Sequence, residues 1–202
     1  MATKKPKQNK PKVLVALTSQ RYIFSRTAFL LIKAALDHAD YEFDFYMELG
    51  CEIASARNRT VHTARERNCT HVLFVDYDMY FPPSAISKLL AEDKDIIGAA
   101  YNRRDEDLKS TAVPVGMTAA PHPRELPTEP FKCECLGAGL LLIKTSVFDK
   151  FPGPWFMFGY QSDGTLSYGE DTYFCQRAIK EAGFDVWADP TLHVKHIGEQ
   201  LF

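Results

Sequence analysis

Short apolar runs alternate with amphipathic segments through the first half of the chain, and this alternation restricts the possible folds more than any other feature. Continuous apolar runs are typical of strands buried on both faces, whereas apolar side chains three and four residues apart indicate helices. The expected strands are residues 13–18, 42–47, 71–76 and 95–101, and the expected helices are residues 26–38, 52–67 and 84–91. This order predicts a single α/β domain over residues 13–202, with a mostly parallel sheet sandwiched by helices.

Two of these elements have patterns that predict which face is buried. In the helix at residues 26–38, Phe29, Ile32 and Leu36 are spaced to lie, together with the alanines, on the face that covers the sheet. In the strand at residues 42–47, Phe45 and Met47 alternate with polar side chains and are expected to point inward.

The second half of the chain is less regular. Residues 102–130 contain five prolines and many charges, which indicates a long loop of the kind that is often functional. A Gly-x-Gly segment at residues 137–139 leads into an apolar strand, and residues 145–150 predict a short helix. A helix at residues 169–182, a final strand at residues 184–190 and a C-terminal segment at residues 193–198 complete the chain.

Composition excludes several classes of protein. A net charge of −2 gives no general reason to expect a nucleic-acid or membrane partner, and no apolar run approaches the roughly 20 residues that span a bilayer. Five cysteines, an odd number, favour reduced thiols in a cytoplasmic protein (host cytoplasm if viral), and no signal peptide is expected. Residues 1–12 carry five lysines and predict a disordered basic tail, or alternatively a handle for an anionic partner such as nucleic acid.

The apolar strand at residues 71–76 ends in two aspartates one residue apart, Asp76 and Asp78, and Pro82-Pro83 prevents it from continuing. In an open α/β sheet, ligands bind beyond the carboxyl ends of the strands, and the alternation of an extended chain places both carboxylates on one side. Two such oxygen ligands suit Mg²⁺ or Mn²⁺, which in turn can bind a diphosphate. The alternative is a solvated turn, where aspartate is common.

Further features are candidates for the same site, and each also has an ordinary structural explanation. Arg57 lies among apolar neighbours in a helix and suits a phosphate contact, or it is a solvated surface residue. Glu170 and Asp171 open a helix, where acidic side chains commonly complement the helix dipole. His196 can supply a nitrogen ligand, although a lone histidine usually does not. Trp155 can stack on a sugar face or pack in the core.

The order of these motifs resembles that of the GT-A glycosyltransferases, in particular the large family-2-like group. The resemblance covers nearly everything from Val13 to Gly198. The matching segments are ARNRTVHTA, LFVDYDMYFPPSAISKLL, GAGLLLIK, GEDTYFCQRAIKEAGFDVWADP and HVKHIG. Gly-Glu-Asp followed by a histidine also resembles the arrangement in β-1,4-galactosyltransferases. Tyr77 departs from the pattern, since many members have an acidic or small residue between the two aspartates.

The resemblance implies a Rossmann-like GT-A fold and a role for each matching residue. Asp76, Asp78 and His196 would bind Mn²⁺ or Mg²⁺. Asp171 would be the general base of an inverting reaction, and Glu170 would hold the acceptor or share that role; retention of configuration stays open. The implied nucleotide-sugar site comprises Thr18, Ser19, Arg21, Arg57, Asp76, Tyr77 and Asp78. The implied acceptor site comprises Gly139, Trp155 and Glu170.

The implied activity is that of a hexosyltransferase-type glycosyltransferase, which moves a sugar from a UDP- or GDP-linked donor to a hydroxyl group. The expected acceptor is a glycan or glycoconjugate, with a modified DNA base as the second candidate. The short chain resembles minimal catalytic cores found in bacteria, phages and large viruses. Two alternatives stay open. One is a non-catalytic GT-A-like module that binds a nucleotide or glycan. The other is a metal-dependent nucleotidyltransferase, disfavoured because TSQRYIFSR after the first strand contains no glycine.

Overall fold

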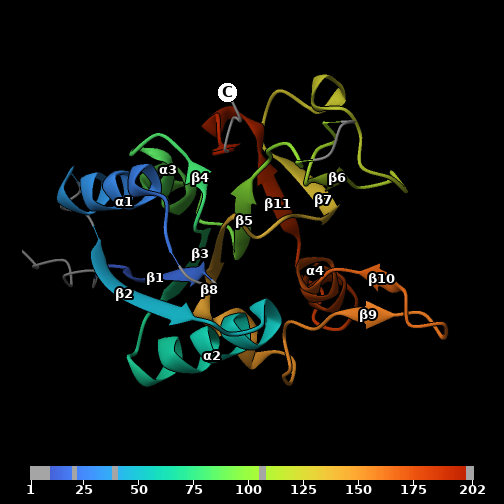
Figure 1. Ribbon diagram of the computed structural model, residues 1–202, viewed down its shortest axis with the longest axis horizontal. Coiled ribbons are helices and arrows are strands. Elements are labelled where there is room, and N and C mark those ends of the chain that lie inside the picture. The colour runs from blue at the N-terminus through green and yellow to red at the C-terminus, as the bar shows by residue number, and fades with distance from the viewer. Residues whose placement is uncertain (1–9, 20–21, 38–40, 105–107, 199–202) are drawn as a thin grey trace, which may run out of the picture.

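The computed structural model describes residues 10–19, 22–37, 41–104 and 108–198, and its centre is one eight-stranded sheet (Figure 1). Most of the predicted tail at residues 1–12 lies outside the described residues, and the first strand begins at Lys12. From one edge to the other, the strands are β2 (Glu42–Leu49), β1 (Lys12–Ser19), β3 (His71–Asp76), β8 (Leu140–Lys144), β5 (Ile96–Ala99), β11 (Val186–Asp189), β7 (Phe131–Cys135) and β6 (Val113–Pro114).

The strand directions show a mixed sheet. β1 runs parallel to β2 and β3, and β5 runs parallel to β11. β8 lies antiparallel between β3 and β5, and β7 lies antiparallel between β11 and β6. The predicted α/β class is therefore confirmed. The pairing is less parallel than expected, because the two strands that begin in the second half at residues 131 and 140 both run against their neighbours.

Helices cover both faces of the sheet (Figure 1). α1 (Ser25–Asp37) and α3 (Ala85–Ala91) share one core with Val13 and Val15 of β1. α2 (Ile53–Glu66) and α4 (Glu170–Lys180) share the other core with Leu14 and Ala16. Because successive side chains of a strand point to opposite faces, a strand covered on both sides is apolar throughout. This arrangement explains the continuous apolar run at the start of the chain.

The predicted buried face of α1 is wrong. Phe29, Ile32 and Leu36 are 63%, 57% and 81% exposed, and the helix instead packs through Leu30, Leu31 and neighbouring small residues. The segment is apolar on two sides, so helical spacing alone fits either face. The prediction for the strand at residues 42–47 is corrected in the same way. β2 is an edge strand, and its Phe45 and Met47 are exposed.

Shorter elements complete the second half. β9 (Gly159–Tyr160) and β10 (Leu166–Tyr168) form a hairpin that leads into α4. Three short 3₁₀-helices are η1 (Pro123–Glu125), η2 (Thr145–Asp149) and η3 (Pro190–Leu192). The described part of residues 102–130 is mostly loop, as its composition predicts, but it is packed against the fold rather than free of structure. It contributes β6 and η1, and its Ser110 and Ala112 are buried.

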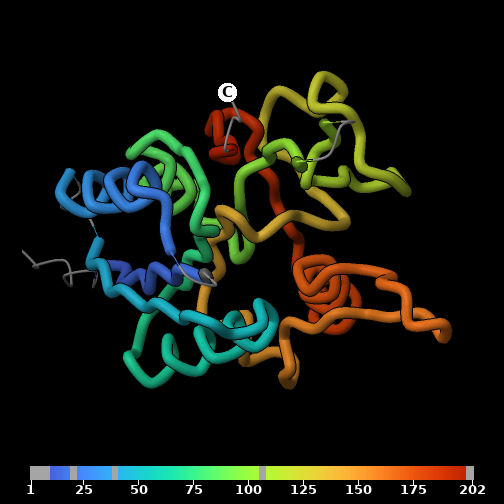
Figure 2. Tube along the Cα trace, in the orientation of Figure 1, coloured from blue at the N-terminus to red at the C-terminus, as the bar shows by residue number. Residues whose placement is uncertain are grey.

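The C-terminal segment returns to the region after β3. β12 (Lys195–His196) pairs antiparallel with β4 (Met79–Tyr80), and the N–H of Ile197 donates to the carbonyl of Asp78 at 2.7 Å. In Figure 2 this segment (red) lies beside the green segments that follow β3 and β5. The pairing therefore places His196 next to the turn that carries the two aspartates. None of the described helices combines the length and apolar character needed to cross a membrane.

Candidate active site

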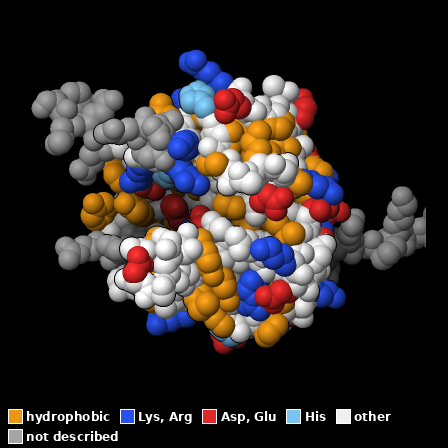
Figure 3. Space-filling model, turned by 90° about the vertical axis from the view of Figure 1, so that its right-hand side faces the viewer, with side chains coloured by type: hydrophobic (Ala, Val, Ile, Leu, Met, Phe, Trp, Pro, Cys, Tyr) orange, Lys and Arg blue, Asp and Glu red, His pale blue; other side chains and the backbone are white. Residues whose placement is uncertain are grey.

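A cleft of about 1270 Å³ opens at the end of the sheet where β1, β3 and β5 finish. Figure 3 shows a hollow on this surface, in which a recessed acidic side chain lies below a group of Lys and Arg side chains. The position agrees with the general rule that α/β sheets bind ligands beyond the carboxyl ends of their strands. Predicted site residues that line the cleft are Thr18, Arg57, Asp76, Tyr77, Asp78, Glu170, Asp171 and His196.

The two aspartates of the motif occupy different environments. Asp76 ends β3, and its carboxylate accepts a weak hydrogen bond from the Thr18 hydroxyl at 3.4 Å. Asp78 is buried and forms an ion pair with Arg104. The intervening Tyr77 stacks on Phe24, with ring centroids 6.0 Å apart. Tyr77 therefore anchors the turn against the segment that precedes α1.

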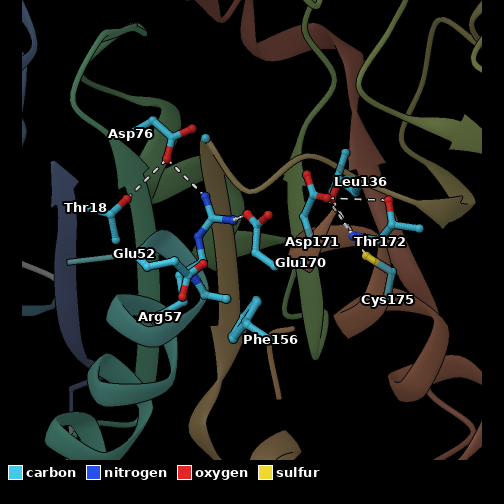
Figure 4. Close-up of polar contacts among 12 residues, drawn as sticks. Thr18, Glu52, Arg57, Asp76, Leu136, Phe156, Glu170, Asp171, Thr172 and Cys175 are labelled. Atoms are coloured by element: carbon cyan, nitrogen blue, oxygen red, sulfur yellow. Dashed lines mark hydrogen bonds and ion pairs between the residues drawn. The ribbon is translucent and has the colours of Figure 1, made fainter. Parts of the chain in front are cut away.

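Arg57 joins the acidic groups of two distant segments (Figure 4). Its side chain is only 2% exposed. Nη2 donates to Asp76 Oδ1 at 3.1 Å, and Nη1 forms an ion pair with Glu170. Burial opposes the charge of Arg57, but Asp76 and Glu170 outweigh it and raise the pKa of the guanidinium. Both Nη groups are thus used by protein carboxylates, so Arg57 fixes the positions of Asp76 and Glu170. Its predicted contact with a donor nucleotide stays a prediction.

Glu170 and Asp171 begin α4, yet they face different partners (Figure 4). Glu170 is buried against Arg57, and burial raises the pKa of its carboxyl in spite of that cation. Asp171 Oδ1 accepts the backbone N–H of Thr172 at 2.7 Å, and no described residue forms an ion pair with it. Of the two carboxylates at this helix start, Asp171 is therefore the one available to a ligand in the cleft.

His196 is held in one tautomer. Its Nδ1 lies 3.0 Å from the carbonyl oxygen of Asn102, and because a carbonyl only accepts, Nδ1 carries the hydrogen. Burial and the nearby Arg104 lower the pKa of the imidazole. A neutral ring whose Nδ1–H is bound to a backbone carbonyl has Nε2 left as a possible metal ligand, a common arrangement for histidine in metal sites.

The fit of a divalent cation to this arrangement is partial. Carboxylates and a neutral imidazole are suitable donors for Mg²⁺ or Mn²⁺. Within the described part of the chain, however, no three His, Cys, Asp or Glu side chains are grouped closely enough to hold a metal ion. Asp76 is bound by Arg57 and Asp78 by Arg104. A cation that used Asp78 would therefore displace the guanidinium of Arg104.

Two other predicted residues that the structure describes, Trp155 and Gly139, do not line the cleft. Trp155 is 4% exposed and packs against Phe148, while its indole N–H donates to the carbonyl of Phe151. The prediction that Trp155 contacts an acceptor is corrected to core packing. Gly139 lies beneath the cleft, where its carbonyl accepts the N–H of Asp76. Ser19 is the last residue of β1, but the structure does not describe its side chain. Arg21 lies outside the described residues.

Several cleft residues were not singled out from the sequence. Tyr101, Arg103 and Arg104 follow β5, whose carboxyl end lies beside that of β3 through the intervening β8. The signal for them was available, since they directly follow an apolar strand, as Asp76 and Asp78 do. Glu52 also lines the cleft and caps α2, because its carboxylate accepts the N–H groups of Ala54 and Ser55.

Comparison with known proteins supports the fold alone. No family model matches the chain, and no curated protein matches it. The crystal structure of A197 from STIV is 16% identical, with a TM-score of 0.64 over 93% of this chain and 86% of that one. HddC from Yersinia pseudotuberculosis is 11% identical over 70% of this chain and 80% of that one, but its TM-score of 0.37 carries no argument. The chain therefore shares the mixed α/β fold of A197.

Proposed function

We propose that the protein is a metal-dependent glycosyltransferase of the GT-A type, which transfers a sugar from a UDP- or GDP-linked donor to a hydroxyl acceptor. One observation carries the proposal. Three segments far apart in the sequence, the Asp76–Asp78 turn, the start of α4 and the C-terminal His196, line a single cleft at the ligand-binding end of the sheet. The GT-A assignment rests on this convergence together with the motif order.

The donor end of the cleft is assigned to the Asp76–Asp78 turn. Asp76, Asp78 and His196 would have to move closer together, and Arg104 would have to leave Asp78, to hold Mg²⁺ or Mn²⁺. The cation would then offset the charge that develops on a departing diphosphate. Thr18 and Tyr77 lie beside this turn and would line the nucleotide portion of the site. Arg57, which is buried, keeps Asp76 in place through their ion pair.

The acceptor end is assigned to the start of α4. Asp171 would accept the proton of the acceptor hydroxyl as its oxygen attacks the anomeric carbon of the sugar. Glu170 is a weaker candidate for that step, because Arg57 already holds its carboxylate. A single base facing the acceptor favours inversion at the anomeric carbon. The preferred acceptor is a glycan or glycoconjugate, followed by a modified DNA base.

A thermal-shift panel of UDP- and GDP-linked sugars, each with and without Mn²⁺, tests the proposal. We expect one nucleotide sugar to raise the melting temperature only when Mn²⁺ is present, and Asp78→Ala to abolish that shift. Asp185→Ala is the matched control, because Asp185 pairs with Lys132 at the amino end of β11, away from the cleft. A shift that persists without Mn²⁺ in Asp78→Ala would remove Asp78 from its assigned role.

A further inference from the structure

Tyr101 is a cleft residue to which the proposed function assigns no role. It follows β5, its side chain is 5% exposed, and it lines the cleft. Its ring makes a T-shaped contact with that of His196, with centroids 5.0 Å apart and planes 85° apart. The backbone N–H of Gly139 donates to the Tyr101 hydroxyl oxygen at 2.8 Å. The hydroxyl is therefore held in one place at the floor of the cleft.

Two glycines make room for this hydroxyl. A Cβ atom at Gly137 would lie 2.9 Å from the Tyr101 hydroxyl oxygen, and a Cβ atom at Gly139 would overlap that oxygen. Real Cβ atoms do not approach other atoms so closely, so a side chain at either position would push the hydroxyl out of place. The Gly-x-Gly spacing at residues 137–139 thus has a physical reason that involves Tyr101.

The proton of this hydroxyl has no acceptor in the protein as described. The Gly139 N–H occupies a lone pair of the oxygen, so it leaves the O–H proton free to donate elsewhere. No described side chain or carbonyl accepts that proton, although buried polar groups are nearly always paired. Tyr101 is one of the residues that line the cleft. A molecule that occupies the cleft would therefore be the nearest candidate to accept this proton.

The surroundings of the hydroxyl indicate which part of a ligand it meets. Tyr101 contacts His196, and Gly139 links it to the donor end, because the Gly139 carbonyl accepts the N–H of Asp76 at 3.0 Å. In the proposed reaction this end receives the diphosphate. Asp76 and Asp78 repel an anion there, so each additional hydrogen-bond donor at this end contributes to holding one.

We infer that the Tyr101 hydroxyl donates a hydrogen bond to an oxygen of the leaving diphosphate. The inference rests on the proposed function and deepens it, since it assigns the contact that distinguishes a nucleoside diphosphate from a monophosphate. Hydrogen bonds to charged acceptors are about twice as strong as neutral ones, and the oxygen gains negative charge as its bond to the sugar breaks.

Tyr101→Phe tests the inference, because it keeps the ring and its contact with His196 and removes only the donor. Binding of UDP, GDP, UMP and GMP is measured by calorimetry in the presence of Mn²⁺. We expect affinity for the preferred diphosphate to fall by roughly ten- to a hundred-fold, the range for a hydrogen bond to a charged group, with affinity for its monophosphate unchanged. Tyr46→Phe is the matched control. It also removes a tyrosine hydroxyl with a protein partner, Glu48, but outside the cleft.

Three other outcomes of these binding measurements would each overturn the inference. If Tyr101→Phe loses affinity equally for the diphosphate and the monophosphate and also has a lower melting temperature, the hydroxyl only supports the local structure. An unchanged diphosphate affinity with weaker binding of the complete nucleotide sugar would place the contact on the sugar. If the unmodified protein binds none of the four nucleotides, the proposed function itself fails, and the inference fails with it.

Discussion

At the scale of single residues, Arg57 sets the arrangement of the candidate active site. It is buried between a carboxylate 19 residues away in the sequence and another 113 residues away. Removing one partner of a buried ion network leaves the others charged and without compensation, which is costly even where the intact network contributes little net stability. The positions of Asp76 and Glu170 therefore depend on a side chain that need not touch a ligand.

We predict that Arg57→Met lowers the free energy of unfolding by about 3–5 kcal/mol, because Asp76 and Glu170 lose their shared cation. Urea denaturation followed by circular dichroism measures the change. Binding of the donor nucleotide should weaken in the same variant, since Asp76 is no longer fixed.

Arg59→Met is the control for this prediction. Arg59 lies on the same helix and pairs with Glu48, but its side chain is 60% exposed. Exposed ion pairs contribute about 0–1 kcal/mol, so the control should remain close to the unmodified protein. Equal effects of the two substitutions would contradict the role assigned to Arg57.

Some of these site residues could be predicted from the sequence and others could not, for identifiable physical reasons. Asp76 and Asp78 were visible because their spacing and the preceding apolar strand are local features. The partnership of Arg57 with Glu170 was not, since it depends on the placement of α4 against α2. Trp155 was ambiguous, because an aromatic residue next to glycine and proline can serve a binding site or a core.

At the scale of secondary-structure elements, the direction of β8 explains how the Gly-x-Gly segment reaches the cleft. β8 lies antiparallel between β3 and β5, so its amino end meets the carboxyl ends of both neighbours. Gly137 and Gly139 precede this strand and therefore lie at the same edge as Asp76 and Tyr101. The apolar pattern predicted the strand, but a pattern does not specify which neighbours a strand pairs with or in which direction.

The helix α1 shows that a local pattern also does not specify which face of a helix is buried. Its segment is apolar on two sides, and only its packing against β1 and its neighbours selects Leu30 and Leu31 over Phe29 and Ile32. Helical periodicity located the helix to within one residue at each end, which confirms that prediction. The choice of face depends on tertiary contacts that a local pattern does not contain.

Adjacent substitutions on α1 test the face that the structure assigns. Leu31 is 3% exposed and Ile32 is 57% exposed. Leu31→Ala should lower the free energy of unfolding by about 2–5 kcal/mol, the range for truncating a buried leucine. Ile32→Ala should change it by about 0.5 kcal/mol or less, as at most surface positions. Chemical denaturation of the two variants measures both values. A larger loss for Ile32→Ala would reverse the assigned face.

At the scale of the whole molecule, the fold identifies the architecture, whereas the cleft indicates the activity. The mixed α/β fold is shared with A197 from STIV at 16% identity, which fixes the architecture and leaves the activity open. The activity is argued from the cleft, where β3, α4 and β12 bring distant acidic groups and a histidine together. The motif order predicted this convergence. The pairing of β12 with β4, which brings His196 to the cleft, could be seen only in the structure.

The most direct test of the account is the rate at which nucleoside diphosphate is released from the stabilising nucleotide sugar, with Mn²⁺ and a panel of hydroxyl acceptors. The proposed function predicts release by the unmodified protein and by the control Glu181→Gln, which alters the far end of α4. Asp171→Asn should bind the donor equally well but release diphosphate at least about a hundred-fold more slowly, as expected for loss of a general base. Release at the unmodified rate by Asp171→Asn, or no release from any donor by the unmodified protein, would contradict it.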